Sequence, residues 1–267
     1  GGAVTGPLAP FRPATPTSGS INNNGPRAPR RSSGSATASA ASNRRWISSF
    51  AASCSVASSR PSVRTPEQRS TPKGRTARIA AARITLEKAD HAERVLKLMG
   101  EFGADQQRYA VHHPWADRLP RDASLGQARH GGDMRLAVFH FPLQGWTDAV
   151  VMNVLQGLAA GVTLEELSRV SYAPLAEVFR AILPREKRHT ELGVVGLAAI
   201  AADAAGRAAA RDAVAYWQPK VADSFGTSGS ARFETLKRFG LRHRPNEALL
   251  ADWIAEVART LAPLGLA

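Results

Sequence analysis

A carboxylate and an imidazole, Glu186 and His189, stand three residues apart in the stretch PREKRHTEL. They fall on a stripe whose members recur at steps of three and four, the spacing of one face of an α-helix. A buried carboxylate needs a ligand or a hydrogen-bond donor, because otherwise it must lose its charge by taking up a proton. Glu-x-x-His facing into a helical bundle is half of a carboxylate-bridged di-iron centre; the other interpretation is a structural pair that water partly reaches. The remaining members of the stripe are apolar or glycine: Leu175, Phe179, Ile182, Gly193, Leu197 and Ile200.

A second half-site is expected on another helix, and His91 is the candidate for its histidine because it shares a helix face with Ile84 and Val95. The residue three positions before His91 is Lys88, a cation, whereas Glu87 stands four positions before it, also on a shared face. The alternative for His91 is a helix-face histidine satisfied by a neighbouring carboxylate. No catalytic side chain is assigned, and the predicted metal ligands are Glu87, His91, Glu186 and His189.

Helical periodicity begins at about residue 75, and no segment alternates in the manner of a β-strand. We therefore predict an all-α helical bundle over residues 75–267. Thr163, with Glu166 three residues on, has the spacing of a capping box, which predicts that a new helix begins there. Pro184 lies inside the longest predicted helix and is a possible kink. The predicted helices cover 79–103, 143–160, a segment from 163, 172–204, 206–225 and 245–263.

The positive charge of the chain is concentrated at its N-terminal end. The net charge is +13, but residues 1–72 hold nine arginines and one acid, and residues 84–267 carry only +1. Residues 1–74 are rich in Ala, Arg, Pro and Ser without apolar periodicity, which predicts a disordered arm. We interpret the arm as an extension without a partner. The alternatives are a phosphate-binding tail and an out-of-frame translation of GC-rich DNA.

Cysteine usage and apolar runs bear on the compartment. The single cysteine, Cys54, excludes an intrachain disulfide framework and fits a reducing, cytoplasmic location. The longest apolar run, residues 192–202, is shorter than the roughly 20 residues that cross a bilayer, so no membrane association is expected.

Several motifs occur in an order that resembles the ferritin-like phenylacetic acid catabolism family, and in particular its epoxidase subunit. The first is the helix start with Trp146 and Asp148, followed by Tyr172-Ala-Pro-Leu-Ala and by the Glu186/His189 pair that ends in Leu-Gly. The C-terminal part resembles the family as well, in DAVAYWQPKVADSFG and RFGLRHRPNEALLADWIAEVARTLAPLGL. The resemblance covers about residues 80–267 and implies a ferritin-like helical bundle.

The resemblance also implies a chemistry. The family's active member forms an epoxide on the aromatic ring of phenylacetyl-CoA with O₂, a di-iron centre and electrons from a reductase, and a sister subunit of the same fold is structural. By position, Glu186 and His189 match the ligand pair of the later helix, and His91 matches the histidine of the earlier one.

The chain departs from the family's ligand pattern at three places. Lys88 stands where the earlier helix has its glutamate, and Gly157 stands at about the position of an acidic ligand, with Gln156 and Asn153 nearby. Residues 45–65, where a first helix should supply another glutamate, contain no acid. Because two hard metal ions need several anionic oxygens, an incomplete metal site is expected.

These observations favour a subunit that resembles the phenylacetyl-CoA epoxidase, with iron as the implied metal and an incomplete site. Its implied partners are the other subunits of a multicomponent oxygenase, a reductase and an aryl-CoA thioester substrate. The alternative is a metal-free structural or docking subunit of such a complex. A nucleic-acid binder that uses the arginine-rich arm is the least favoured class, since the predicted folded part is nearly neutral.

Overall fold

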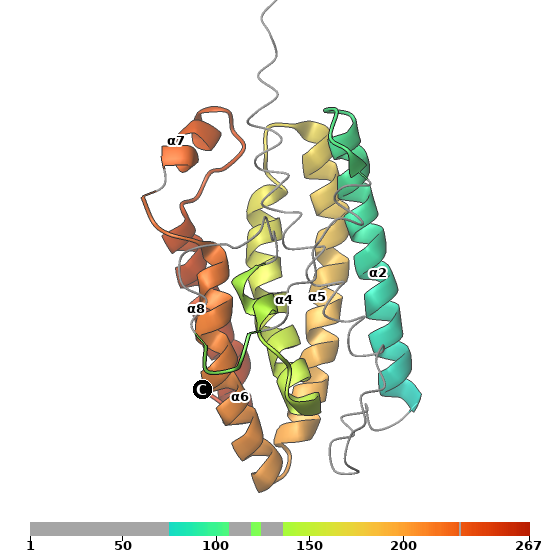
Figure 1. Ribbon diagram of the computed structural model, residues 1–267, viewed down its shortest axis with the longest axis vertical. Helices are drawn as coiled ribbons and strands as arrows, with labels where there is room; N and C mark the ends of the chain where they lie inside the picture. The colour runs from blue at the N-terminus through green and yellow to red at the C-terminus, as the bar shows by residue number, and fades with distance from the viewer. Residues whose placement is uncertain (1–74, 107–118, 124–135, 230) are drawn as a thin grey trace, which may run out of the picture. The chain divides into compact units, whose positions relative to one another are not determined.

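Helices account for most of the described chain, which comprises residues 75–106, 119–123, 136–229 and 231–267 of a computed structural model (Figure 1). These residues belong to one compact unit and contain no β-strand, which confirms the all-α prediction for this part of the chain. The predicted arm, residues 1–74, lies outside the described residues. The α-helices are α2 (Arg75–Gly100), α4 (Gly145–Leu167), α5 (Ala173–Ala201), α6 (Ala204–Ala222), α7 (Ala231–Arg238) and α8 (Asn246–Leu261). Short 3-10 helices are η2 (Ala137–His140), η3 (Asp223–Phe225) and η4 (Ala262–Leu264).

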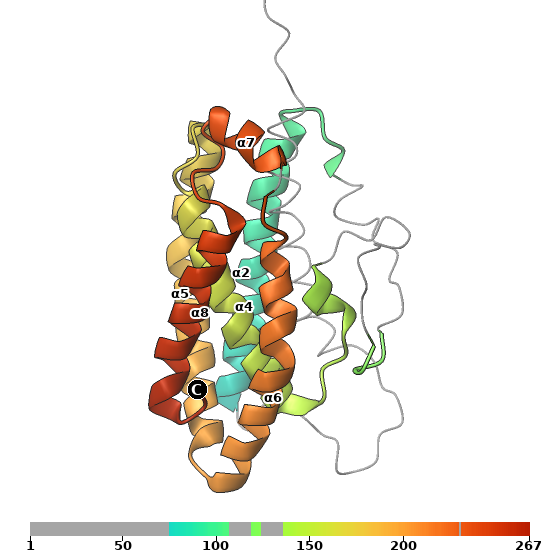
Figure 2. The ribbon, with the colours of Figure 1, turned by 90° about the vertical axis from the view of Figure 1, so that its left-hand side faces the viewer.

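The helical pair α4 and α5 forms the centre of the bundle. Helix α4 packs most extensively against α5 and also against α6 and α8, whereas α2 packs along α5. Figures 1 and 2 together place α6 and α8 on one side of the α4–α5 pair and α2 on the other. Any side chain shared between α2 and α5 therefore lies on the side of the bundle away from α6 and α8.

Large apolar side chains fill the interior between α4 and the C-terminal helices. Trp253 of α8 is fully buried, and its indole N–H donates to the backbone carbonyl of Leu155 in α4 at 3.0 Å. This bond satisfies the one polar atom of a large buried ring, which is the usual condition for placing tryptophan in a core. Other fully buried apolar residues are Trp217, Phe179, Ile182, Leu197 and Leu261.

Glycines allow α4 and α5 to approach each other closely. A Cβ atom on Gly157 of α4 would lie 2.3 Å from Oγ1 and 3.2 Å from Cβ of Thr190 in α5. A Cβ on Gly193 of α5 would lie 3.0 Å from the Val154 side chain of α4. The seam between the two central helices thus depends on residues without a side chain at these positions.

Two predictions of helix boundaries are wrong. No helix begins at Thr163, because α4 runs without interruption from Gly145 to Leu167 and Thr163 lies in its interior. The chain stays helical through Gly161 since Leu164 and Leu167 continue the buried face, so tertiary packing overrides the local capping signal. Helix α7 lies between the predicted helices 206–225 and 245–263, in a segment for which no helix is predicted. Helix α5 extends through Pro184, as predicted for the longest helix.

Helix α4 is also long and apolar enough to cross a membrane by length and composition alone. In the bundle, however, 67% of the apolar 18-residue stretch of α4 is buried. The burial accounts for the apolar composition of α4, which is that of a core helix surrounded by α5, α6 and α8.

Candidate functional site

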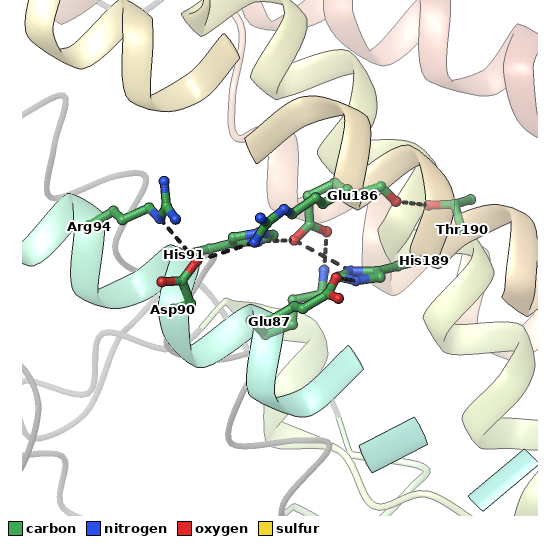
Figure 3. A network of polar contacts seen from close by, with 9 residues as sticks. Glu87, Asp90, His91, Arg94, Glu186, His189 and Thr190 are labelled. Carbon is green, nitrogen blue, oxygen red and sulfur yellow. Dashed lines mark hydrogen bonds and ion pairs between the residues drawn. The ribbon is translucent and has the colours of Figure 1, made fainter. Parts of the chain in front are cut away.

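The four predicted ligand residues converge from α2 and α5, as Figure 3 shows for their side chains. His91 Nδ1 lies 2.8 Å from Glu186 Oε1, and His189 Nε2 lies 2.6 Å from Glu87 Oε2. His189 Nδ1 is 3.8 Å from Glu186 Oε1, and the two imidazole rings are stacked with their centroids 6.0 Å apart. The four residues that were predicted from helical spacing to share a site are therefore in contact in the structure. Their role as metal ligands stays a prediction.

Lys88, which departs from the ligand pattern in the sequence, is the fifth member of this cluster. Its ammonium group forms an ion pair with Glu186 Oε2, and both side chains are 1% exposed. The spacing that placed His91 on the inner face of α2 holds for Lys88 too, since Ile84, Lys88, His91 and Val95 follow at steps of three and four. The position of Lys88 was thus readable from the sequence, although its ion-pair partner was not.

The charges of Glu186 and His189 follow from these contacts. Burial raises the pKa of the Glu186 carboxyl, but the charge of Lys88 and the hydrogen bonds from His91 and Lys88 together outweigh it. The net result is a pKa below the ordinary value of 4.5, so Glu186 is a carboxylate at neutral pH. Burial lowers the pKa of His189 below the ordinary 6.5, against the opposing influence of Glu87 and Glu186, and His189 is therefore neutral at pH 7.

Hydrogen bonding assigns the tautomer of each histidine that faces the cluster. A neutral His189 donates its Nε2–H to the Glu87 carboxylate, which leaves a lone pair on Nδ1. His91 donates from Nδ1 to Glu186. Among the described residues neither His189 Nδ1 nor His91 Nε2 has a hydrogen-bond partner, and both atoms are buried.

The α4 side of the cluster offers no carboxylate. Thr190 fills the space in front of Gly157, and its hydroxyl donates to the backbone carbonyl of Glu186 at 3.0 Å. Gln156 is fully buried, but its amide is neutral. The sequence has no acid at position 157, and an acidic side chain there would collide with Thr190 of α5 in this packing. The acid expected from residues 45–65 lies outside the described residues.

The arrangement does not fit the di-iron centre that the resemblance implies. Both oxygens of Glu186 are taken, one by Lys88 and the other by His91. Within the described ranges, no group of three or more His, Cys, Asp or Glu side chains is arranged to hold a metal ion. An ammonium group supplies the positive charge that a metal ion would bring, and it would repel such an ion at close range.

A second buried glutamate, Glu166, has a different role, which its spacing from Thr163 does not predict. Its Oε1 accepts hydrogen bonds from the backbone N–H groups of His243, at 2.5 Å, and Arg244, at 3.0 Å. The Arg242 guanidinium lies 3.8 Å from the same oxygen. Glu166 thus ties the end of α4 to the segment before α8. Instead of capping a helix at Thr163, it satisfies backbone donors 77 and 78 residues away.

Asp148, at the start of α4, also has an anchoring role. Its carboxylate forms an ion pair with Arg121 and accepts from the backbone N–H of Gln144 at 2.8 Å. The Arg121 guanidinium lies over the Tyr216 ring of α6, 3.5 Å from the ring centroid. These contacts hold the segment of residues 119–123 against α4 and α6.

The comparisons with known proteins agree with the resemblance found in the sequence. The family model described as "Phenylacetic acid catabolic protein" matches residues 76–267. The match covers every helix of the bundle after the first residue of α2. Among curated proteins, none matches the chain.

Proposed function

Because the chain belongs to the phenylacetic acid catabolic protein family, we propose that it is a structural subunit of a multicomponent phenylacetate-catabolising oxygenase. In this proposal the chain supports the assembly, and a homologous subunit carries out the oxygen chemistry on an aryl-CoA thioester with electrons from a reductase. The proposed location is the cytoplasm, which a chain with one cysteine fits.

The buried ion pair of Lys88 with Glu186 is the observation that supports this proposal. A di-iron centre needs several free carboxylate oxygens to balance the charge of two metal ions. Here the charge of the Glu186 carboxylate is already balanced by the Lys88 ammonium group. Both Glu186 oxygens have a partner, since Lys88 contacts Oε2 and His91 contacts Oε1. The side chains that would hold metal instead hold α2 against α5.

The contacts of the cluster explain what a structural role requires of these residues. Two hydrogen-bonded pairs, Glu186 with His91 and Glu87 with His189, each join α2 to α5. Buried polar groups with defined partners specify one register between two helices, because sliding by one turn would leave them unpaired. A subunit that docks on others by its shape benefits from such a fixed register.

The competing candidate is the oxygenase subunit itself, with iron held by Glu186, His189, His91 and Glu87. Two buried ring nitrogens, on His91 and His189, favour it because they have no hydrogen-bond partner among the described residues. The two candidates differ in whether iron binds to this chain during turnover.

The test is to reconstitute the complex with the homologous subunits and the reductase from the same source. We expect the chain to co-purify with them, and omission of the chain to abolish assembly. Formation of epoxide from phenylacetyl-CoA is expected to continue when this chain carries Glu186→Gln, as it does with the exposed control Glu191→Gln. About two irons per copy of this chain, lost together with activity in Glu186→Ala, would return the oxygenase candidate to first place.

A further inference from the structure

Helix α2 carries a second apolar stripe, apart from the one that packs on α5. Ile79, Ala82, Leu86 and Ala89 follow one another at steps of three and four, and all four are exposed. Leu86 is 73% exposed and Ile79 is 54% exposed. Large apolar side chains that gather on one exposed helix face are typical of a surface that another protein covers. We call these four residues the outer stripe of α2.

The position of α2 at the side of the bundle leaves this stripe accessible. Within the described ranges, α5 is the helix against which α2 packs extensively, and α2 lies away from α6 and α8 (Figures 1 and 2). The ion pairs between α2 and α5 show that the two helices are antiparallel. Val195 of α5, which is 68% exposed, is therefore level with the turn of α2 that carries Ile79. Of the five large exposed apolar side chains in the described chain, three thus lie on this pair of helices.

The spacing of the outer stripe is that of the a and d positions of a heptad repeat. Ile79 and Leu86 stand at a, and Ala82 and Ala89 stand at d. Residues at these positions form the seam between two helices that pack along each other. The distance between packed helices depends on the side chains at the contact, so alanine at both d positions allows a close approach. The outer stripe is therefore suited to a partner that presents a helix.

The charges beside the stripe indicate which helix fits. Arg83 and Asp90 each follow a d residue, which places both at e positions, where charged side chains set the partner and the orientation of a helix pair. When two copies of α2 pack antiparallel, the e positions of one lie beside the e positions of the other, so Arg83 of each copy meets Asp90 of the other. Arg83 is exposed and forms no ion pair with the described residues. The side chain of Asp90 is 42% exposed, with an arginine contact at 3.5 Å that leaves it accessible.

We infer that a second copy of this chain covers the outer stripe of α2, in a two-fold symmetric dimer whose two α2 helices pack antiparallel. Leu86 of one copy lies beside Ala89 of the other, and an Arg83–Asp90 pair forms at each end of this contact. A two-fold axis requires a surface that complements itself, and the opposite charges at positions 83 and 90 supply that property. This inference concerns the chain alone and does not depend on the proposed structural role.

The test is the molar mass of the purified full chain, measured by sedimentation equilibrium over a range of concentrations. We expect the wild type to be a dimer. Leu86→Glu places a carboxylate in the apolar seam and is expected to raise the Kd of the dimer at least about 10-fold. The matched control, Ile254→Glu, changes a residue of α8 that is 48% exposed, and it is expected to dimerise as the wild type does. Circular dichroism checks that each variant keeps its helices.

Charge reversal tests the orientation and keeps the experiment decisive if Leu86→Glu fails to fold. Arg83→Asp sets two carboxylates against each other at each end of the contact and is expected to weaken the dimer. Arg83→Asp/Asp90→Arg brings opposite charges together again and is expected to bind more tightly than Arg83→Asp.

Three results would overturn the inference. A monomeric wild type would leave the outer stripe to residues 1–74 or to another protein. A dimer that neither Leu86→Glu nor Arg83→Asp weakens would show that the two copies meet elsewhere. Equal Kd values for Arg83→Asp and for the double charge reversal would exclude the antiparallel arrangement.

Discussion

Glu186 and Glu166 are both almost fully buried, yet the molecule neutralises them in different ways. Glu186 lies between two long helices and meets side chains, the Lys88 ammonium and the His91 imidazole. Glu166 lies at the end of α4 and meets mainly backbone N–H groups, those of His243 and Arg244. Glu186 is thus part of a cluster of charged and polar side chains, whereas Glu166 fixes the backbone of the segment before α8.

The difference shows that burial of a carboxylate predicts a partner but not the kind of partner. Side-chain partners can be exchanged by mutation, so the partners of Glu186 depend on the residue types at positions 88 and 91. Backbone donors cannot be exchanged in this way, because every residue type carries the same N–H group except proline. The Glu166 contact is therefore tied to the fold, while the Glu186 contact is open to functional change.

The largest effect is expected from Lys88→Met, which leaves the Glu186 charge buried without its cation. Removing one partner of a buried ion pair costs about 3 to 5 kcal/mol of stability. The measurement is the free energy of unfolding in urea at pH 7. The double variant Lys88→Met/Glu186→Gln, which removes both charges and keeps an acceptor for His91, is expected to recover more than half of the loss. A loss in Lys88→Met no larger than that in the exposed control Lys97→Met would mean that the pair is not buried as described.

A smaller loss, about 1 to 3 kcal/mol, is expected from Glu166→Ala, because two backbone N–H groups lose their acceptor. Glu166→Gln keeps a carbonyl oxygen and should lose less. Amide hydrogen exchange at His243 and Arg244 is expected to accelerate in Glu166→Ala while exchange in α2 does not change. The neighbouring exposed residue supplies the control, Glu165→Ala. Acceleration throughout the bundle would contradict a local latch.

The smallest effect is a dependence of stability on pH. The pKa values of His189 and Glu186 are both below their ordinary values of 6.5 and 4.5, so the unfolded chain binds more protons than the folded chain as pH falls. The free energy of unfolding should therefore decrease as the pH falls below 6.5, because His189 takes up a proton more readily in the unfolded chain. It should decrease further below about pH 4.5, because the same holds for Glu186.

Urea midpoints between pH 8 and pH 4 test this order. In Lys88→Met, burial becomes the dominant influence and raises the pKa of Glu186, so protonation then favours the folded state. The difference in stability between this variant and the wild type should therefore narrow as pH falls. A constant difference across this range would show that Glu186 does not carry the charge assigned to it.

The inner faces of the helices could be predicted from the sequence. Glu186, His189 and His91 share their helix faces with apolar residues at steps of three and four, and those faces are buried. The pairing could not, since the contacts between α2 and α5 join residues 95 to 102 positions apart. For the same reason the sequence shows Lys88 only as a departure from the ligand pattern, and its ion pair with Glu186 appears in the structure alone. Whether a lysine on an inner face is buried depends on a counter-charge that only the tertiary structure supplies.

Local patterns failed where packing outweighed them. The capping-box spacing from Thr163 to Glu166 describes a helix start, but the apolar face of α4 continues through it and Glu166 finds distant backbone donors. Helix α7 has only eight residues and few buried side chains, so its periodicity is too short to read. The family-like motifs, in contrast, recur in order from Trp146 to the C-terminal segment, and the family that they predict is confirmed by the family model over residues 76–267.

The contact between Gly157 and Thr190 also bears on how this chain could change in evolution. A carboxylate at position 157 requires that Thr190 first become smaller, because the two positions cannot both carry their side chains in the present packing. Replacement of Thr190 by alanine or glycine also removes the hydrogen bond from its hydroxyl to the Glu186 carbonyl. In the present packing, a carboxylate at position 157 therefore needs a change at Thr190 as well as the replacement of Gly157.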